Sequence, residues 1–481
     1  MQNYEELMDE IRLVYTLDDI GELLEWDEEV TMPENGLKAR SRQKSAVSKL
    51  RHRVLTGERL GEILEALDRD ELDREQEAVV REVEREREKM IAVPPDLMER
   101  ISSKQTEAVE AWRQAREESD FEKFRPHLEE MVELMREYAA EVEPGEEPYR
   151  VLFREYEPYI GFERMENMLE ELRDGLQPII DGASGGKELD ISVPEEGQKE
   201  FCRDIARDLG LGEEESRLDT STHPFTYGNA LEGRITTRFS GDPSEAALIT
   251  MHEGGHALYN LGLPEEHYGS PLGAPREMSI HESQSKIWEN HVARSREFWG
   301  YVTPRMKEFF PEIEASARDF YRARTRIRDD NPIRVEADEL TFHLHIALRF
   351  ELERELVNGE LAVEDLPEQW DRKMEEYLGL RPENDSEGVL QDIHWALGAF
   401  GYFPTYSLGS AIAAQLYNAA QQEIDIEEAV ARGDFSPLRD WLRENIHRHG
   451  QLYRTEELVE HATGEKPSAK YFLDYARQKY Q

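Results

Sequence analysis

The sequence predicts a mainly α-helical protein with a small β-sheet near its middle. Apolar residues recur at helical spacing from the start of the chain, where Leu7, Ile11 and Val14 share one face. The irregular stretch 209–243 contains the strand candidate 234–239, which is β-branched and aromatic with partial alternation. After this stretch, helical patterns return and continue, interrupted by prolines, towards the end of the chain.

Breaker residues divide the first half of the chain into helices. The first helical pattern stops at 31–36, and a second long pattern runs through Leu55. The charged stretch 71–90 keeps a thin apolar stripe, which favours a solvated helix of a long hairpin over an interaction tail. We expect residues 1–120 to form an N-terminal helical lobe that covers part of a larger helical body, 121–481. Further helices are predicted at 97–116, 126–142 and 165–173, and a loop at 182–190.

The charge of the chain argues against two classes of partner. There are 59 Lys and Arg against 105 Asp and Glu, which gives a net charge of −46. Such a surface repels the phosphates of nucleic acids and of anionic membranes. Arg outnumbers Lys by 45 to 14, and an acidic, Lys-poor surface is typical of halophilic proteins, in which salt screens self-repulsion. A disordered acidic tail is the alternative, but the acids are spread along the whole chain.

Cysteine usage and hydropathy predict a cytoplasmic protein. Cys202 is the only cysteine, so neither an intrachain disulfide nor a cysteine metal cluster can form. The first residues are acidic and have no apolar core, unlike a signal peptide. No apolar run approaches the ~20 residues that span a bilayer.

A metal-binding pattern, His-Glu-Gly-Gly-His, lies at 252–256. His252 and His256 are one helical turn apart, so on a helix both imidazoles project from one face and can bind one Zn²⁺. Glu253 is then close enough to take a proton from water at the metal and to pass it to a leaving amine. In a chain with 14 His, the alternative interpretation is that both are ordinary core or surface histidines whose hydrogen bonds are made within the protein or with water. The pattern predicts zinc-dependent hydrolysis.

The residues before the pattern support a helix there. Asp242 is placed as an N-cap, Pro243 as the first helical residue, and Glu245 three residues past the cap. Gly254 and Gly255 weaken such a helix by ~1 kcal/mol each relative to Ala. We therefore expect another backbone, or a substrate, to approach closely at this point.

A catalytic zinc needs a third protein ligand and an open fourth position. Glu282, on a following predicted helix, is favoured, and His281 and Glu289 are the competitors. His281 points about 100° away from Glu282 on a helix, so only one of the two can face the metal. Glu289 lies two turns further on and could instead orient an imidazole N–H.

Two later stretches contain further candidates. His394, or the hydroxyl of Tyr406, could stabilise the oxyanion that forms when water attacks a carbonyl; packed core roles stay open for both. Arg334 lies near a predicted helix start and could clamp a carboxylate in bidentate fashion. A surface role is the alternative for this arginine in a chain with 45 Arg.

The chain closely resembles the carboxypeptidase Taq family of thermostable zinc metallocarboxypeptidases, essentially from end to end. Several motifs in order across most of the length are far more specific than the zinc pattern alone. The matching residues lie at 26–33, 223–225, 234–236, 252–256, 281–284, 333–334 with 337–338, and 388 with 391–392 and 394–395. One position departs from the family pattern: Glu232 stands where Asp is usual, which puts the local geometry around Arg234 in doubt but not the metal site.

The resemblance implies a large two-lobed helical fold with a deep groove and a small sheet near the active site, similar to neurolysin-like gluzincins. It implies a homodimer that removes single residues from the C-termini of peptide substrates with broad specificity, and Zn²⁺ as cofactor, with Co²⁺ possible. His252, His256 and Glu282 are the implied metal ligands, and Glu253 the general base. His394 and Tyr406 fall where oxyanion-stabilising side chains lie, and Arg334 where the substrate carboxylate is held.

Two other functions stay open at this stage. A metallo-oligopeptidase that cuts internal bonds would share the metal chemistry, and would also cleave an amidated peptide. A catalytically silent helical interaction protein would keep the fold without the chemistry. The joint presence of metal ligands, base and oxyanion candidates argues against the silent protein.

Overall fold

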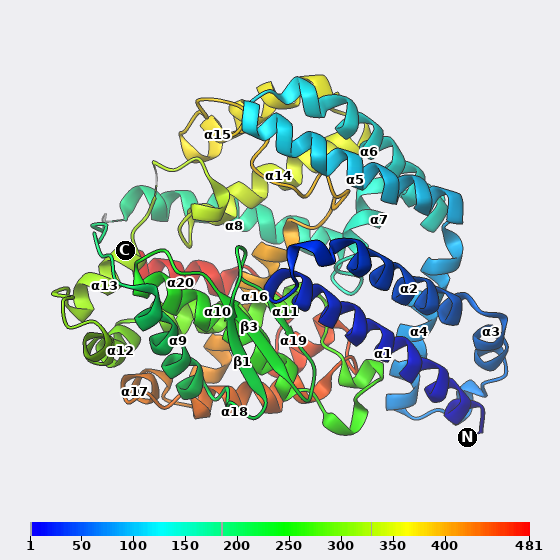
Figure 1. The fold of residues 1–481 in the computed structure, drawn as a ribbon, viewed down its shortest axis with the longest axis horizontal. Coiled ribbons are helices and arrows are strands. Elements are labelled where there is room, and N and C mark those ends of the chain that lie inside the picture. Colours follow the sequence, from blue (N-terminus) through cyan, green and yellow to red (C-terminus); the bar gives the residue numbers. More distant parts are fainter. Residues whose placement is uncertain (1, 184–185, 329) are drawn as a thin grey trace.

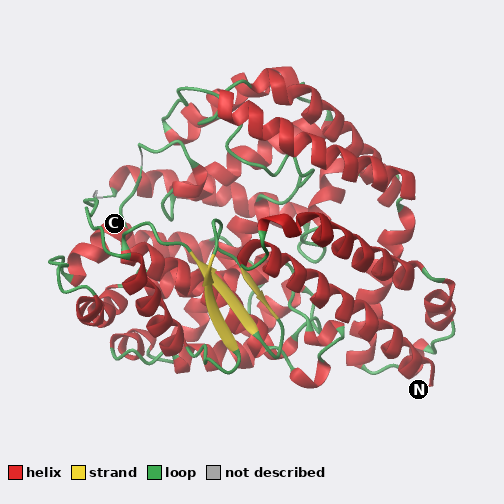
Figure 2. Ribbon diagram, in the orientation of Figure 1, coloured by secondary structure: helices red, strands yellow, loops and turns green. Residues whose placement is uncertain are grey.

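Helices dominate the chain, and a three-stranded sheet lies near its middle (Figure 1, Figure 2). The computed structural model describes residues 2–183, 186–328 and 330–481. Within these ranges, no helix is both long enough and apolar enough to cross a membrane. The predicted fold class, mainly α with a small sheet, is confirmed.

The first four helices share a second hydrophobic core, to which Leu272 of the short turn Pro271–Gly273 also contributes. Val14 of the first helix and Leu55 of the second pack there, together with Val79 and Val83 from the highly charged stretch. The thin apolar stripe of that stretch is thus buried, which confirms the predicted helix. These helices are α1 (Gln2–Val30), α2 (Leu37–Thr56), α3 (Glu58–Glu65) and α4 (Arg74–Ala92).

The next helices belong to the main core. They are α5 (Pro95–Glu118), α6 (Phe121–Val142), α7 (Pro148–Arg154) and α8 (Phe162–Gly182). Helices α5, α6 and α8 are longer than predicted. Helix α6 begins five residues before Pro126, because Asp120 caps it and a proline removes only one helical hydrogen bond. Of the predicted loop 182–190, Gly182 ends α8, residues 183 and 186–190 are irregular, and 184–185 lie outside the described residues.

The sheet consists of β1 (Ser216–Thr220), β2 (Thr226–Gly228) and β3 (Gly233–Thr237) in the order β1-β3-β2. Strand β3 is the predicted strand, shifted towards the N-terminus. It pairs in parallel with β1 and antiparallel with β2. The sequence did not predict the two outer strands.

Helix α10 (Pro243–Gly262) lies against this sheet and carries the metal-binding pattern. It contacts β2 and β3 on one side and α9 (Glu195–Leu209) and α11 (Met278–Lys286) on others. A π-helical segment, Ile287–Ala293, continues α11 directly. The remaining helices are α12 (Arg296–Phe309), α13 (Ala317–Arg324), α14 (Thr341–Asn358), α15 (Leu366–Leu378), α16 (Pro404–Gln421), α17 (Ile426–Ala431), α18 (Ser436–Asn445), α19 (Thr455–Thr463) and α20 (Lys470–Tyr480).

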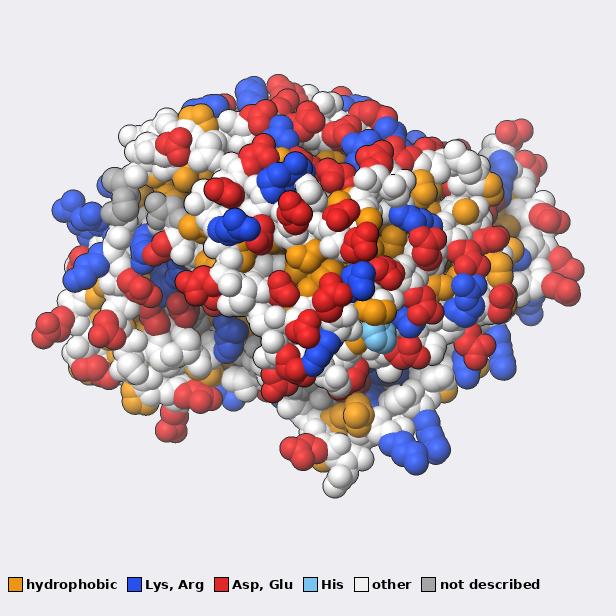
Figure 3. Space-filling view, turned by 90° about the horizontal axis from the view of Figure 1, so that it is seen from above, with side chains coloured by type: hydrophobic (Ala, Val, Ile, Leu, Met, Phe, Trp, Pro, Cys, Tyr) orange, Lys and Arg blue, Asp and Glu red, His pale blue; other side chains and the backbone are white. Residues whose placement is uncertain are grey.

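Acidic side chains cover the surface without forming a separate acidic segment. On the face seen in Figure 3 they are scattered over the whole outline, with basic side chains between them. Many basic groups are paired with acids, for example Arg100 with Glu137 at 2.8 Å. The acidic residues are therefore part of folded elements, as their spread along the sequence indicates.

Candidate active site

Helix α10 begins as its sequence predicts, with one difference. Asp242 is the N-cap and accepts a hydrogen bond from the Ser244 amide at 2.8 Å, and Pro243 is the first helical residue. The Glu245 side chain does not accept a hydrogen bond from the backbone of the N-cap residue Asp242. It accepts a hydrogen bond from Ser240 Oγ at 2.6 Å and pairs with Arg324 instead. The cap fixes the helix whose next turns carry the two histidines.

Gly255 lets helix α11 approach α10 closely. A Cβ atom at this position would lie 2.6 Å from the carbonyl oxygen of Gln284 and 2.8 Å from Cα of Ser285. Such contacts are too short for any side chain, so only glycine fits here. The expectation that another backbone approaches at this glycine is confirmed, and the approach brings Glu282 of α11 beside the histidines.

Three side chains converge between α10 and α11. One ligand atom from each of His252, His256 and Glu282 lies within 4.8 Å of the others. Glu282 Oε2 is 3.4 Å from His256 Nε2 and 3.9 Å from His252 Nε2. Two imidazoles and one carboxylate with an open side form the donor set of a catalytic zinc site, and donor atoms about 2 Å from one ion fit these separations. The residues present therefore fit a divalent metal ion.

The Nδ1 atoms of both histidines point away from this centre and have partners of their own. His252 Nδ1 lies 2.8 Å from Glu289 Oε2. His256 Nδ1 lies 2.6 Å from Nδ1 of His281, whose Nε2 contacts Asn260 Oδ1 at 3.2 Å. The structure thus places His281 and Glu289, the two competitors for the third ligand position, behind the histidines.

The electrostatics favour a charged carboxylate at the centre. Burial raises the pKa of Glu282, but Lys286 and His252 outweigh burial and lower the pKa well below its usual value. For His252, burial lowers the pKa, but the carboxylates of Glu282 and Glu289 outweigh it and raise the pKa. Burial and neighbouring His256 lower the pKa of His281 to about 3, so this imidazole is neutral near pH 7.

Glu253 is buried and held by a residue that the sequence did not reveal. Thr226 of strand β2 donates its hydroxyl to Glu253 Oε2 at 2.7 Å. A lone threonine in a short strand carries no sequence signal for this contact, which depends on how the sheet packs against α10. The hydrogen bond fixes the carboxylate beside the metal ligands.

His394 and Tyr406 lie together. The Tyr406 hydroxyl is 3.5 Å from His394 Nε2. Burial lowers the pKa of His394 to about 4, so its imidazole is neutral at pH 7. Burial also raises the pKa of Tyr406, which therefore keeps its proton and can donate a hydrogen bond. Tyr402, also unassigned from the sequence, lines the cavity next to Tyr406.

Arg334 lies beneath these aromatic rings in an ion-pair network. Its Nε and Nη2 atoms donate to Asp392 Oδ1 at 2.9 and 2.7 Å, and its side chain is 9% exposed. Asp392 Oδ2 pairs with the fully buried Arg349 at 2.7 Å. Nη1 of Arg334 donates to none of the residues that the structure describes. Arg334 is thus anchored on one edge, with its guanidinium carbon 5.4 Å from the Tyr406 ring centre.

The metal site opens into a groove of about 1130 Å³. One wall comes from α1 and α2, with Asp19, Glu22 and Arg51 among its residues. The other wall contains His252, Glu253 and His256 together with Tyr406. Glu232, the residue that departs from the family pattern, accepts two hydrogen bonds from Arg234 at 3.0 and 2.8 Å, so the longer carboxylate still orients this arginine.

Comparisons with known proteins identify the family of this chain. The family described as Carboxypeptidase Taq (M32) metallopeptidase matches residues 6–480. Thermostable carboxypeptidase 1 of Thermus thermophilus is 39% identical over 500 residues, covering 99% of this chain and 98% of its own. Thermostable carboxypeptidase 1 of Pyrococcus furiosus is 37% identical over 494 residues, covering 100% and 98%.

Solved structures show the same fold along the whole chain. A carboxypeptidase structure from Pyrococcus furiosus superimposes with a TM-score of 0.97 at 36% identity, covering 100% of this chain and 99% of that one. An M32 carboxypeptidase from Deinococcus radiodurans R1 superimposes with a TM-score of 0.96 at 35% identity and the same coverage. The chain belongs to the carboxypeptidase Taq (M32) family of metallopeptidases.

Proposed function

We propose that this metallocarboxypeptidase uses Zn²⁺, held by His252, His256 and Glu282, to release single amino acids from peptide C-termini with broad specificity. The convergence of these three side chains at one open side of the groove is the observation that carries the proposal. Co²⁺ suits the same nitrogen and oxygen donors. When bound, the ion polarises the scissile carbonyl and lowers the pKa of water.

The chain supplies the proton transfers. Glu253, steadied by Thr226, takes a proton from the attacking water and later gives one to the leaving amine. Its position one residue after His252 places it on the helix turn that faces the groove.

The Tyr406 hydroxyl donates a hydrogen bond to the carbonyl oxygen as negative charge develops there. The neutral imidazole of His394, 3.5 Å away, holds this hydroxyl in position. Arg334 holds the free carboxylate of the substrate through Nη1, because Asp392 occupies its other edge. An anchored carboxylate places the last peptide bond, and no other, at the metal. This restricts cleavage to one residue at a time.

Product analysis of a short peptide tests the proposal. With Zn²⁺, the free-acid peptide should lose residues one by one from its C-terminus, and the same peptide with an amidated C-terminus should stay intact. A chelator should stop the reaction, and Glu253→Gln should bind zinc without cleaving. Internal cleavage of the amidated peptide would identify an oligopeptidase instead. Unchanged activity of Glu253→Gln would overturn the assigned base.

The family resemblance also supports a homodimer. Light scattering coupled to size-exclusion chromatography should give twice the 56.0 kDa chain mass. A particle of a single chain mass at micromolar concentration would contradict this part of the proposal.

A further inference from the structure

Glu289 faces helix α10 from the π-helical segment that follows α11. It lies seven residues after Glu282, which is close to two turns of a helix, so both carboxylates point towards α10. Glu282 reaches the Nε2 side of the histidines, and Glu289 reaches Nδ1 of His252. One continuous helical element thus approaches the same histidine from both sides of its ring.

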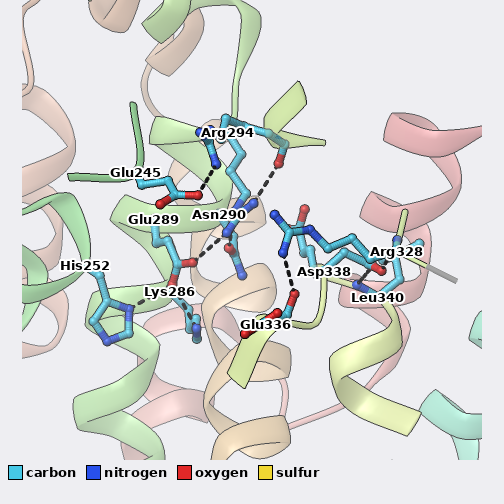
Figure 4. Close-up of polar contacts among 12 residues, drawn as sticks. Glu245, His252, Lys286, Glu289, Asn290, Arg294, Arg328, Glu336, Asp338 and Leu340 are labelled. Atoms are coloured by element: carbon cyan, nitrogen blue, oxygen red, sulfur yellow. Dashed lines mark hydrogen bonds and ion pairs between the residues drawn. The ribbon is translucent and has the colours of Figure 1, made fainter. Parts of the chain in front are cut away.

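The carboxylate of Glu289 is held by three buried or half-buried groups, drawn in Figure 4. Oε2 accepts hydrogen bonds from His252 Nδ1 and from Lys286 Nζ, each at 2.8 Å. Oε1 accepts from Arg294 Nη2 at 2.9 Å. The side chains of Glu289 and Lys286 are 14% and 15% exposed, so these charged hydrogen bonds are shielded from water.

Arg294 cannot easily turn away from Glu289. Its Nε donates to Asn290 Oδ1 at 3.1 Å, and its Nη1 donates to the carbonyl oxygen of Arg324 at 2.6 Å. The carbonyl oxygen of Asn290 in turn accepts from Tyr475 of helix α20 at 2.9 Å. The position of Glu289 is therefore fixed by contacts on two further helices.

This arrangement decides which nitrogen of His252 carries the proton. A carboxylate only accepts hydrogen bonds, so Nδ1 of His252 must donate. Nε2 then keeps its lone pair and points at Glu282, in the direction that a metal ligand requires. His256 lacks such a partner, because its Nδ1 meets the neutral ring of His281.

We infer that Glu289 is the positioning residue of this metal site. It fixes the tautomer and the ring orientation of His252, and Lys286 and Arg294 hold it in place. The inference rests on the proposed function, since it takes His252 as a metal ligand. It assigns to Glu289 no contact with substrate.

Zinc affinity of Glu289→Gln tests the inference. The full chain is stripped of metal, and the dissociation constant of Zn²⁺ is measured by competition with a chelator. We expect a ten- to hundredfold rise, as is typical when a partner behind a metal-binding histidine is lost. The visible spectrum of the Co²⁺-loaded protein should change as well, because it reports the geometry of the ligands. A dissociation constant within about threefold of wild type would overturn the inference.

Glu339→Gln is the matched control. Glu339 is a fully buried carboxylate near the same arginine, paired with Lys479 at 2.8 Å, and it contacts none of the metal ligands. We expect a loss of thermal stability with unchanged zinc affinity. An equal loss of zinc affinity in both variants would assign the effect to general destabilisation, and would also overturn the inference.

Two further measurements keep the outcomes separate. If Glu289→Gln does not fold, the double variant Lys286→Gln with Glu289→Gln removes one buried cation together with the carboxylate, and the same rise in the dissociation constant is expected. Wild type should bind one Zn²⁺ per chain, and His252→Ala should lose it. If wild type binds no Zn²⁺, or if His252→Ala still binds it, the proposed function is contradicted. If both of these results are as expected but the Glu289 variants bind Zn²⁺ as tightly as wild type, only the inference is contradicted.

Discussion

The hydroxyl of Thr226 lies 2.7 Å from Glu253 Oε2 and 3.0 Å from the backbone oxygen of the same residue. A side chain of the small sheet thus holds the carboxylate that we propose as general base on the neighbouring helix. A hydrogen bond to one oxygen fixes the carboxylate and leaves the other oxygen free to receive a proton. Strand β2 therefore contributes to the chemistry of the site as well as to its walls.

Replacing Thr226 by Val should slow catalysis without removing the metal. The change keeps the β-branched shape but deletes the donor to Glu253. A hydrogen bond to a charged group contributes about 1.5–3 kcal/mol. Since only part of this is lost in the transition state, we expect kcat to fall about tenfold, with zinc affinity unchanged. Steady-state kinetics with a free-acid peptide measure this.

Thr237→Val is the control for this prediction. Thr237 is fully buried in β3, and its hydroxyl has no hydrogen-bond partner within the described part of the chain. The same substitution there should leave kcat as in wild type. Equal kcat for wild type and Thr226→Val would show that Thr226 does not position the base.

The helices and the zinc pattern were predictable because their signals are local. Helical spacing of apolar residues and a capped helix start are visible within a few residues of sequence, as at Asp242. The two outer strands had no such signal. Strand β1 places the charged pair Arg217 and Asp219 on its exposed face, and β2 has three residues, so neither contains a run that alternation can reveal.

The partners of the site residues could not be predicted in the same way. Thr226 is 27 positions from Glu253, and Asp392 is 58 positions from Arg334. Such pairs form only when separate elements pack together. The sequence favoured Glu282 as the third metal ligand before the family resemblance implied the same residue. The likeness to neurolysin-like enzymes stays a prediction.

Asp392 should make the metal-free protein sensitive to acid. Burial raises its pKa, but Arg349 and Arg334 outweigh burial and hold the pKa below the usual value of 3.8. A carboxyl group with a lowered pKa in the folded state binds fewer protons than in the unfolded state. Its contribution to stability is therefore present above about pH 4 and is lost as the pH falls further.

Urea unfolding of Asp392→Asn at several pH values measures this contribution. Removing one partner of a buried ion pair costs about 3–5 kcal/mol. We therefore expect the free energy of unfolding of the variant to lie below that of wild type by this amount at pH 7, and the difference to shrink below pH 4. Glu137→Gln, which breaks the exposed pair with Arg100, should show no measurable deficit at any pH. A deficit of constant size from pH 7 to pH 3 would contradict the assignment.

Salt should stabilise the protein, because its net charge of −46 produces self-repulsion in the folded state. The screening length falls from about 10 Å at 0.1 M to about 3 Å at 1 M salt. We expect the thermal unfolding temperature to rise steeply over this range of KCl and less beyond it. Sucrose at matched osmolality, which does not screen charge, should raise it less. A temperature that stays flat or falls with KCl would refute the predicted halophilic character.

Arg334→Gln should raise KM for a free-acid peptide while changing kcat less. The substitution removes the charge that we propose binds the substrate carboxylate, and a charged hydrogen bond of about 1.5–3 kcal/mol corresponds to a ten- to hundredfold change in binding. The preference for free-acid over amidated peptide should weaken in parallel.

Arg349→Gln separates this role from the ion pair with Asp392. Arg349 contacts the same carboxylate but is fully buried, whereas Arg334 lies 5.4 Å from the ring centre of Tyr406, which lines the groove. Its loss should lower stability and leave the preference for free-acid peptides intact in the protein that folds. If both variants lose the preference equally, the Asp392 network shapes the site as a whole and Arg334 is not the carboxylate anchor. If neither variant loses it, a donor other than Arg334 binds the terminal carboxylate.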